Sequence, residues 1–132
     1  NKENSSSWIL EEWKAPKVKR DWGYYRVLHD PSANTKVKEL VVEPGKKLSM
    51  QRHSERSEHW FIDEGVATVY TLDSSSDVDV LGIYKRHQAL HIPVNTWHQL
   101  SNETDKVLKL IEIQYGTNCI EDDIERKYYA SN

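Results

Sequence analysis

The chain has little cysteine, no long apolar run and no excess of charge of either sign. Its single cysteine, Cys119, excludes an internal disulfide and a cysteine-rich zinc finger. No apolar run approaches the roughly 20 residues that span a bilayer, so we expect no membrane segment and no signal peptide. A net charge of −3, with basic residues scattered, gives no reason to expect a nucleic-acid partner. A reducing, cytoplasmic location fits these features.

What is present describes an ordinary folded domain. The 132 residues are enough for one domain with a modest core, and 37% of them are hydrophobic and 30% charged. This composition is typical of globular rather than disordered proteins. We predict an N-terminal extension over residues 1–18 that contains a short helix, with Ser7 in position to cap it. Residues 19–132 are then the folded domain.

From Trp22 onward, short β-prone runs alternate with turn signals. The breaks are "DPSAN", "EPG", "DEG", "DSSSD" and "SNETD". No spacer has the length of a crossover helix, which argues against βαβ units and favours an antiparallel, all-β sandwich or small barrel. The tail "CIEDDIERKYYASN" predicts a short C-terminal helix. Eight strands are expected, over residues 23–28, 36–42, 47–53, 58–62, 67–72, 78–84, 89–93 and 107–115.

Polar side chains gather in the stretch "QRHSERSEHW". Gln51 and His53 are two residues apart, so on a strand they share one face, about 7 Å apart along the backbone. After a polar turn, Glu58 returns on the same face as Trp60 and Ile62. A glutamate in a mostly apolar interior is costly unless it is paired or binds a metal. A solvated charged hairpin explains this stretch equally well, so both interpretations stay open here.

A second histidine segment, "HIPVNTWHQLSN", follows about forty residues later. Pro93 and Asn95 predict a turn, because asparagine tolerates the left-handed backbone that turns often need. His98 then enters another strand, with Leu100 on the same face. A lone histidine there is usually structural. Together with the glutamine, histidine and glutamate of the first segment, it would complete four nitrogen and oxygen ligands.

The joint spacing of these segments resembles the two cupin motifs. The first has the form Gly-x5-Gln-x-His-x4-Glu-x6-Gly, begins at Gly45, and carries Gln51 in place of the motif's first histidine. The second has the form Pro-x-Asn-x2-His-x3-Asn, begins at Pro93, and carries Asn95 in place of a glycine. The stretches "KRDWGYYRVL", "EPGKKLSMQRHSERSEHWFIDEGVATV" and "IEIQYGTNCIEDDIER" are similar to the cupin domain of type II phosphomannose isomerases. The resemblance covers roughly residues 19–126.

This resemblance implies a jelly-roll barrel that holds one divalent metal ion through Gln51, His53, Glu58 and His98. Zinc is the first expectation, with manganese, nickel or cobalt as alternatives. The resemblance also implies interconversion of mannose 6-phosphate and fructose 6-phosphate, in which a proton moves between C1 and C2 through an enediol. An ion with one anionic ligand keeps a net positive charge and polarises the sugar oxygens. The neutral amide of Gln51 favours zinc, manganese or nickel over an iron oxygenase centre.

Such a reaction also needs cations for the phosphate and a group that carries the proton. Guanidinium groups suit bidentate phosphate binding, and Lys46 and Arg126 are assigned to the catalytic site. Glu121 and Asp122 belong to an acidic run that could fold over the barrel mouth and carry the proton. The same run is also a normal helix start, favoured by the helix dipole. The cations considered for the phosphate are Lys46, Lys47, Arg52, Arg56, Arg86 and Arg126.

Two departures from the family pattern leave three functions open. The ending "KYYASN" replaces an Asp-x-Tyr-Gly-Arg sequence, and His53 is followed by Ser54 and Glu55 where many relatives have consecutive histidines. The chain is therefore a stand-alone mannose-6-phosphate isomerase, a non-catalytic module that binds metal and sugar, or another sugar-phosphate or nucleotide-sugar isomerase or epimerase. Epimerases of this kind use a His–carboxylate pair without metal. We also expect a homodimer, because small barrels have exposed sheet edges.

Overall fold

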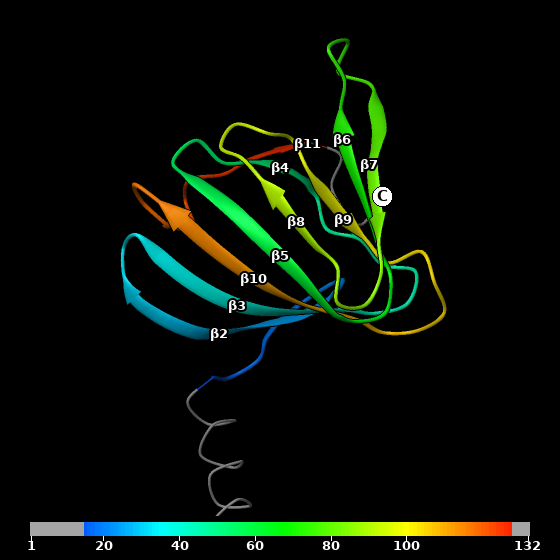
Figure 1. Ribbon diagram of the computed structural model, residues 1–132, viewed down its shortest axis with the longest axis horizontal. Helices are drawn as coiled ribbons and strands as arrows, with labels where there is room; N and C mark the ends of the chain where they lie inside the picture. The colour runs from blue at the N-terminus through cyan, green and yellow to red at the C-terminus, as the bar shows by residue number, and fades with distance from the viewer. Residues whose placement is uncertain (1–14, 128–132) are drawn as a thin grey trace, which may run out of the picture.

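A computed structural model describes residues 15–127 as an all-β structure (Figure 1). Every strand pairing is antiparallel, which confirms the predicted fold class. Within residues 15–127 no helix exists that is long and apolar enough to cross a membrane. The strands are β1 (Val18–Arg20), β2 (Gly23–Ser32), β3 (Thr35–Val42), β4 (Met50–Arg52), β5 (Arg56–Glu64), β6 (Ala67–Leu72), β7 (Val78–Tyr84), β8 (Ala89–Ile92), β9 (Gln99–Ser101), β10 (Leu108–Gly116) and β11 (Glu125–Lys127).

The strands form two walls. Six of them make one sheet in the order β1-β2-β3-β10-β5-β8. The others make a β11-β4 pair and a β7-β6-β9 sheet. An isolated bridge between Gln51 and His98 joins β4 to the start of β9, so these two small sheets continue into one another. Figure 1 shows this second wall facing the six-stranded sheet, with the hairpin of β6 and β7 extending beyond it.

The inner face of the barrel is apolar at one end and polar at the other. Strand alternation sends every second side chain of β3, β5 and β10 inward, and the burial of β5 and β10 follows this period. The strand register then places apolar side chains together at one end and polar side chains together at the other. Across β10, the register pairs Leu110 with Leu40 and Ile62, Glu112 with Lys38 and Trp60, and Gln114 with Lys36 and Glu58. The apolar end holds the core, and the polar end is left for a site.

The core is one cluster contributed by both walls. Its members are fully or almost fully buried aliphatic side chains and one indole, whose removal from water is the main favourable contribution to folding. Trp22, Tyr25, Leu48 and Tyr84 pack against it from the edge. The cluster consists of Leu40, Val42, Trp60, Ile62, Ala67, Val69, Leu90, Ile92, Leu100, Leu108 and Leu110.

All eight predicted strands are present, but one is shorter than expected. The run predicted over residues 47–53 is a strand only at β4. Just before it, the side-chain amide of Gln99 donates to the Leu48 carbonyl at 2.9 Å, so a side chain takes the place of a ladder partner. The strand expected after His98 is β9, whereas β1 and β11 were not predicted, because three residues are too few to carry a periodic pattern.

The predicted C-terminal helix is wrong over its described part. Residues 119–124 are irregular apart from a turn at residues 121 and 122, and β11 then pairs with β4. The acidic groups that would begin a helix are bound elsewhere: Glu121 by Lys36 and Lys38, and Asp123 by the backbone of residues 54 and 55. These long-range contacts outweigh the local helix signal. The predicted N-terminal helix, with Ser7, lies outside the described residues.

Candidate metal centre and cavity

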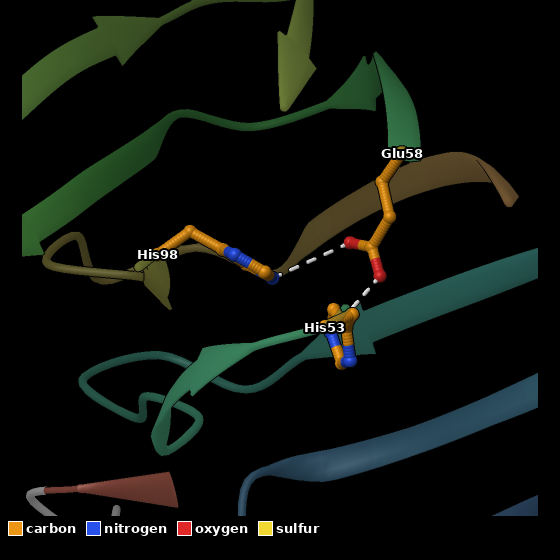
Figure 2. Close-up of side chains that lie close together, drawn as sticks. All are labelled: His53, Glu58 and His98. Atoms are coloured by element: carbon orange, nitrogen blue, oxygen red, sulfur yellow. Dashed lines mark ion pairs between the residues drawn. The ribbon is translucent and has the colours of Figure 1, made fainter. Parts of the chain in front are cut away.

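Three of the four predicted ligands converge at the polar end of the barrel. His53, Glu58 and His98 are buried, and their ligand atoms lie within 4.8 Å of one another. Glu58 Oε2 is 3.2 Å from His53 Nε2, and Glu58 Oε1 is 3.5 Å from His98 Nε2. Figure 2 shows both imidazoles pointing at the two oxygens of this carboxylate. The cluster thus joins residues 53 and 58 of the first segment to residue 98 of the second, about forty residues later.

Backbone pairing explains how they meet. Glu58 points inward because it lies two residues before the core residue Trp60 on β5 and therefore shares its face. Gln51 and His98 exchange both backbone hydrogen bonds, at 2.8 and 2.9 Å, so their side chains leave the same face of the wall. Asn95 has a φ of 58°, as the turn prediction required, and its N–H donates to the His53 carbonyl at 2.7 Å. This turn fixes the histidine segment against the residue that follows β4.

Hydrogen bonds orient both imidazoles for binding a cation. His53 Nδ1 lies 2.8 Å from the Asp123 carbonyl, and His98 Nδ1 lies 2.9 Å from the Thr96 carbonyl. A carbonyl only accepts, so each Nδ1 carries the proton and each Nε2 faces Glu58 with its lone pair, once neutral. Metal-bound histidines in proteins are held in this way.

The spacing and chemistry of the donor set fit a divalent ion. Ligand atoms about 2.1 Å from a tetrahedral ion are about 3.4 Å apart, close to the two separations measured from Glu58. Gln51, the fourth predicted ligand, lines the same small hollow as Glu58, Trp60 and His98. Its side-chain Nε2 donates to Ser49 Oγ at 3.2 Å. Two imidazoles, one carboxylate and a nearby amide suit zinc and similar ions.

A second buried carboxyl stands beside the centre and was not predicted. The indole N–H of Trp60 lies 3.1 Å from both Glu58 Oε1 and Glu112 Oε2. Burial opposes ionisation of Glu58, but hydrogen bonds from His53 and His98 hold its pKa well below the usual value. Burial raises the pKa of Glu112 to about 8, and the negative charge of Glu58 adds to this. One carboxyl is therefore ionised and the other protonated at neutral pH.

Burial and the contact with Glu58 also act on the pKa of His98. Burial alone would lower the pKa of His98, yet the Glu58 carboxylate raises it above the usual value. Arg56 supplies a further positive charge: its Nε lies 3.1 Å from Glu58 Oε2, and its Nη2 lies 3.3 Å from His53 Nε2. This guanidinium helps to compensate the negative charge of the buried Glu58 carboxylate.

A cavity of about 610 Å³ lies beside the candidate metal centre and shares Gln51 and Glu112 with the small hollow that Glu58 and His98 line. Its lining brings together five residues singled out from the sequence: Gln51, Arg56, Glu121, Asp122 and Arg126. Glu121 also binds Lys38, at 3.0 Å. Burial acts against its ionisation, but the positive charge of Lys38 keeps the pKa of Glu121 below the usual value.

Four other predicted cations do not line this cavity. Arg52 forms a bidentate pair with Glu125, at 2.9 and 3.0 Å, and lies over the Trp97 ring. Arg86 donates to the Asp63 carbonyl at 3.1 Å. The side chains of Lys46 and Lys47 belong to the loop before β4 and not to the cavity wall. The assignment of Lys46 to the catalytic site is therefore not supported by its position.

The cavity residues that sequence reasoning missed include three charged ones on strands: Arg20, Lys38 and Glu112. A signal existed for two of them. Lys38 lies two residues from Leu40 on β3, and Glu112 lies two residues from Leu110 on β10. Each therefore continues the inward face of its apolar neighbour. Arg20 gave no such signal, because β1 is too short for a pattern to be read.

The sequence matches the family described as "Mannose-6-phosphate isomerase C-terminal" over residues 10–128. The chain belongs to this family. Among related proteins of this isomerase family, a mannose-1-phosphate guanylyltransferase of Salmonella muenchen is 38% identical over 116 residues, which are 88% of this chain and 23% of that protein. The alginate biosynthesis protein AlgA of Pseudomonas aeruginosa is 38% identical over 109 residues, which are 83% of this chain and 21% of AlgA. The chain thus spans less than a quarter of the length of these relatives.

Solved structures show which fold this isomerase-family chain has. The capsular polysaccharide assembling protein CapF of Staphylococcus aureus matches with a TM-score of 0.73 at 15% identity, over 85% of this chain and 34% of CapF. Oxalate decarboxylase of Bacillus subtilis matches with a TM-score of 0.73 at 13% identity, over 88% of this chain and 31% of that enzyme. At such low identity these matches show the fold alone, and it is the predicted cupin fold.

Proposed function

We propose that the chain is a metal-dependent mannose-6-phosphate isomerase that interconverts mannose 6-phosphate and fructose 6-phosphate. The observation that carries this proposal is the buried His53–Glu58–His98 cluster, which lies beside a polar cavity lined by Gln51. Gln51 is the proposed fourth ligand and zinc the proposed ion, with manganese, nickel or cobalt as alternatives. When bound, the ion would act as a Lewis acid on the sugar oxygens.

The protein's own groups bind and orient the sugar. Gln114 Oε1 is buried, lines the cavity and has no hydrogen-bond partner within the described chain, so it is a ready acceptor for a sugar hydroxyl. Glu121 and Asp122 line the same cavity and are the proposed proton carriers between C1 and C2. Arg126, also assigned to the catalytic site, lies beside them.

The direct test is conversion of fructose 6-phosphate to mannose 6-phosphate by protein stripped of metal and then resupplied with zinc, manganese, nickel or cobalt. We expect turnover only after metal is added. His98→Ala removes one ligand, so metal content by elemental analysis and turnover should both fall to background while circular dichroism still shows a β fold. Gln51→His, which offers another nitrogen ligand, should keep the metal.

Other results would select one of the rival functions. Protein that binds metal and sugar phosphate without turnover would be a non-catalytic binding module. Turnover of another sugar phosphate or nucleotide sugar in the stripped protein would indicate a metal-free isomerase or epimerase. Unchanged metal content in His98→Ala would refute the proposed ligands.

We also propose a homodimer formed through β7. This strand is an edge of its sheet, so one side of its backbone has no neighbouring strand among residues 15–127. Four of its apolar side chains are exposed: Val78, Val80, Leu81 and Ile83. An exposed apolar edge strand is a template for pairing with another chain, and a second copy offers the same edge.

A further inference from the structure

We infer that Arg20 and Arg126 form an anion-binding subsite at the cavity wall, which takes the phosphate group of a phosphorylated sugar. Arg20 was not recognised from the sequence, and Arg126 was one of six cations considered there. The inference rests on the proposed function only in placing the sugar itself next to the metal centre. The binding of the phosphate is tested separately from turnover below.

Four cationic side chains line the cavity, and two of them are already neutralised. Lys38 lies 3.0 Å from Glu121, and Arg56 lies 3.1 Å from Glu58. Both cations are buried, and each is held in place by its own carboxylate. Their positive charge is compensated within the protein, so they are poor candidates for the main partner of an incoming dianion.

Arg20 and Arg126 differ from this pair in charge balance. In the described part of the chain, neither guanidinium is joined to a carboxylate by an ion pair. Both side chains are exposed and both line the cavity. Two guanidinium groups without an ion-pair partner in one cavity wall suit a phosphate ester, because their planar N–H pairs match its oxygens.

Two contacts hold the Arg20 side chain in position for binding a phosphate. Arg20 Nη1 donates to the Lys19 carbonyl at 2.9 Å, and its guanidinium lies over the Tyr25 ring, 5.4 Å from the centroid. Tyr25 itself lines the cavity, so the ring directs Arg20 along the wall. These contacts restrict the side chain without cancelling its charge.

Arg126 is tied to the metal centre through strand register. On β11 it is paired with Gln51 of β4, so the two side chains are direct cross-strand neighbours. Its own neighbours in sequence point the other way: Glu125 binds Arg52, and Lys127 lies over the Trp97 ring. Arg126 is therefore the residue of β11 that lines the cavity, next to a proposed metal ligand.

Two acidic residues, Asp21 and Asp122, also line this cavity, and among the described residues neither forms an ion pair with Arg20 or Arg126. The two guanidinium groups can therefore donate to phosphate oxygens, while the carboxylates can accept hydrogen bonds from sugar hydroxyls. A ligand that combines a phosphate with a polyol matches both kinds of group.

The test compares glucitol 6-phosphate with glucitol, by calorimetry on metal-loaded protein. Neither compound can be isomerised as an aldose or ketose, so the measurement reports binding alone. We expect Arg20→Gln and Arg126→Gln each to weaken glucitol 6-phosphate binding about tenfold or more, and the double variant about a hundredfold. Binding of glucitol should change less than twofold. Arg86→Gln, which removes a cation outside the cavity, is the matched control and should leave both affinities unchanged.

The outcomes separate this inference from the proposed function. Loss of glucitol 6-phosphate binding in the double variant, in protein that never converts fructose 6-phosphate, supports the subsite and refutes the isomerase. Isomerase turnover with an unchanged KM in the double variant supports the isomerase and overturns the subsite. Unaltered protein that binds glucitol 6-phosphate no better than glucitol also overturns it. Thermal melts and metal content of each variant show that the fold and the metal centre are intact.

Discussion

At the scale of single residues, the clearest measurable effect is on Tyr70. Its hydroxyl donates a hydrogen bond to the Glu103 carboxylate, which also accepts from Ser101 Oγ at 3.2 Å. The bond to Glu103 raises the pKa of Tyr70 to about 12. The folded pKa is higher than the unfolded value of about 10, so the neutral tyrosine stabilises the fold below pH 10. This contribution is lost as the pH rises from about 10 through 12.

We predict that Glu103→Gln returns the pKa of Tyr70 toward about 10, because the negative charge that opposes ionisation is gone. Ultraviolet absorbance of tyrosinate during an alkaline titration measures this, and Tyr70→Phe identifies which transition belongs to Tyr70. A transition that stays in place in Glu103→Gln would show that the hydrogen bond does not control the titration.

The residues of the metal centre could be predicted from the sequence, and their neighbours only in part. Strand alternation put Glu58 on the face of Trp60 but left a solvated hairpin open, and the resemblance to the cupin motifs was needed to join Glu58 with His98. Arg56 was expected at the mouth, yet it lies buried against Glu58, because residues two apart on a strand share a face. The meeting of Lys38 with Glu112 depends on the register of β3 against β10, which no local pattern encodes.

At the scale of elements, the turn between β5 and β6 depends on Gly65. Its φ is 88°, and a Cβ atom there would lie 2.6 Å from the Val107 carbonyl oxygen, just before β10. Gly65→Ala therefore combines a left-handed backbone with a backbone clash, and we predict a loss of about 2–4 kcal/mol in the free energy of unfolding. Urea denaturation followed by circular dichroism measures it.

Gly45→Ala is the matched control for this turn. Gly45 has a similar φ of 75°, but nothing lies within 4 Å of its added Cβ. It should cost only about 1–2 kcal/mol, which is the conformational part alone. Equal losses in the two variants would mean that the contact with Val107 has no energetic effect.

Elements also show where prediction from sequence stops. All the strands of four residues or more were predicted from β-prone runs between turn signals. Very short strands such as β1, β9 and β11 form because a partner strand lies beside them, which is a property of the folded barrel. The acidic run was read as a helix start, but Asp123 and Glu121 instead bind groups about seventy and eighty residues away.

At the scale of the whole molecule, the proposed dimer can be tested by light scattering. We predict a mass of twice the chain's 15.5 kDa for the unaltered protein. Ile83 is 61% exposed on β7, and Ile83→Lys places a charge in the proposed interface, so this variant should be monomeric. Leu28 on β2 is 48% exposed, and Leu28→Lys is the control that should stay dimeric. A monomeric unaltered protein at micromolar concentration would refute the dimer.

The contact between His53 and Asp123 has a consequence for how the protein is made. The chain is synthesised from its N-terminus, so His53, Glu58 and His98 all exist before residue 123 has been added. The carbonyl that fixes the His53 ring, and the carboxylate that holds Ser54 and Glu55, come only with this late segment. The candidate metal centre is therefore complete only once residue 123 has been added, and a nascent or clipped chain that ends before Asp123 would carry His53, Glu58 and His98 without the contacts that fix the His53 segment.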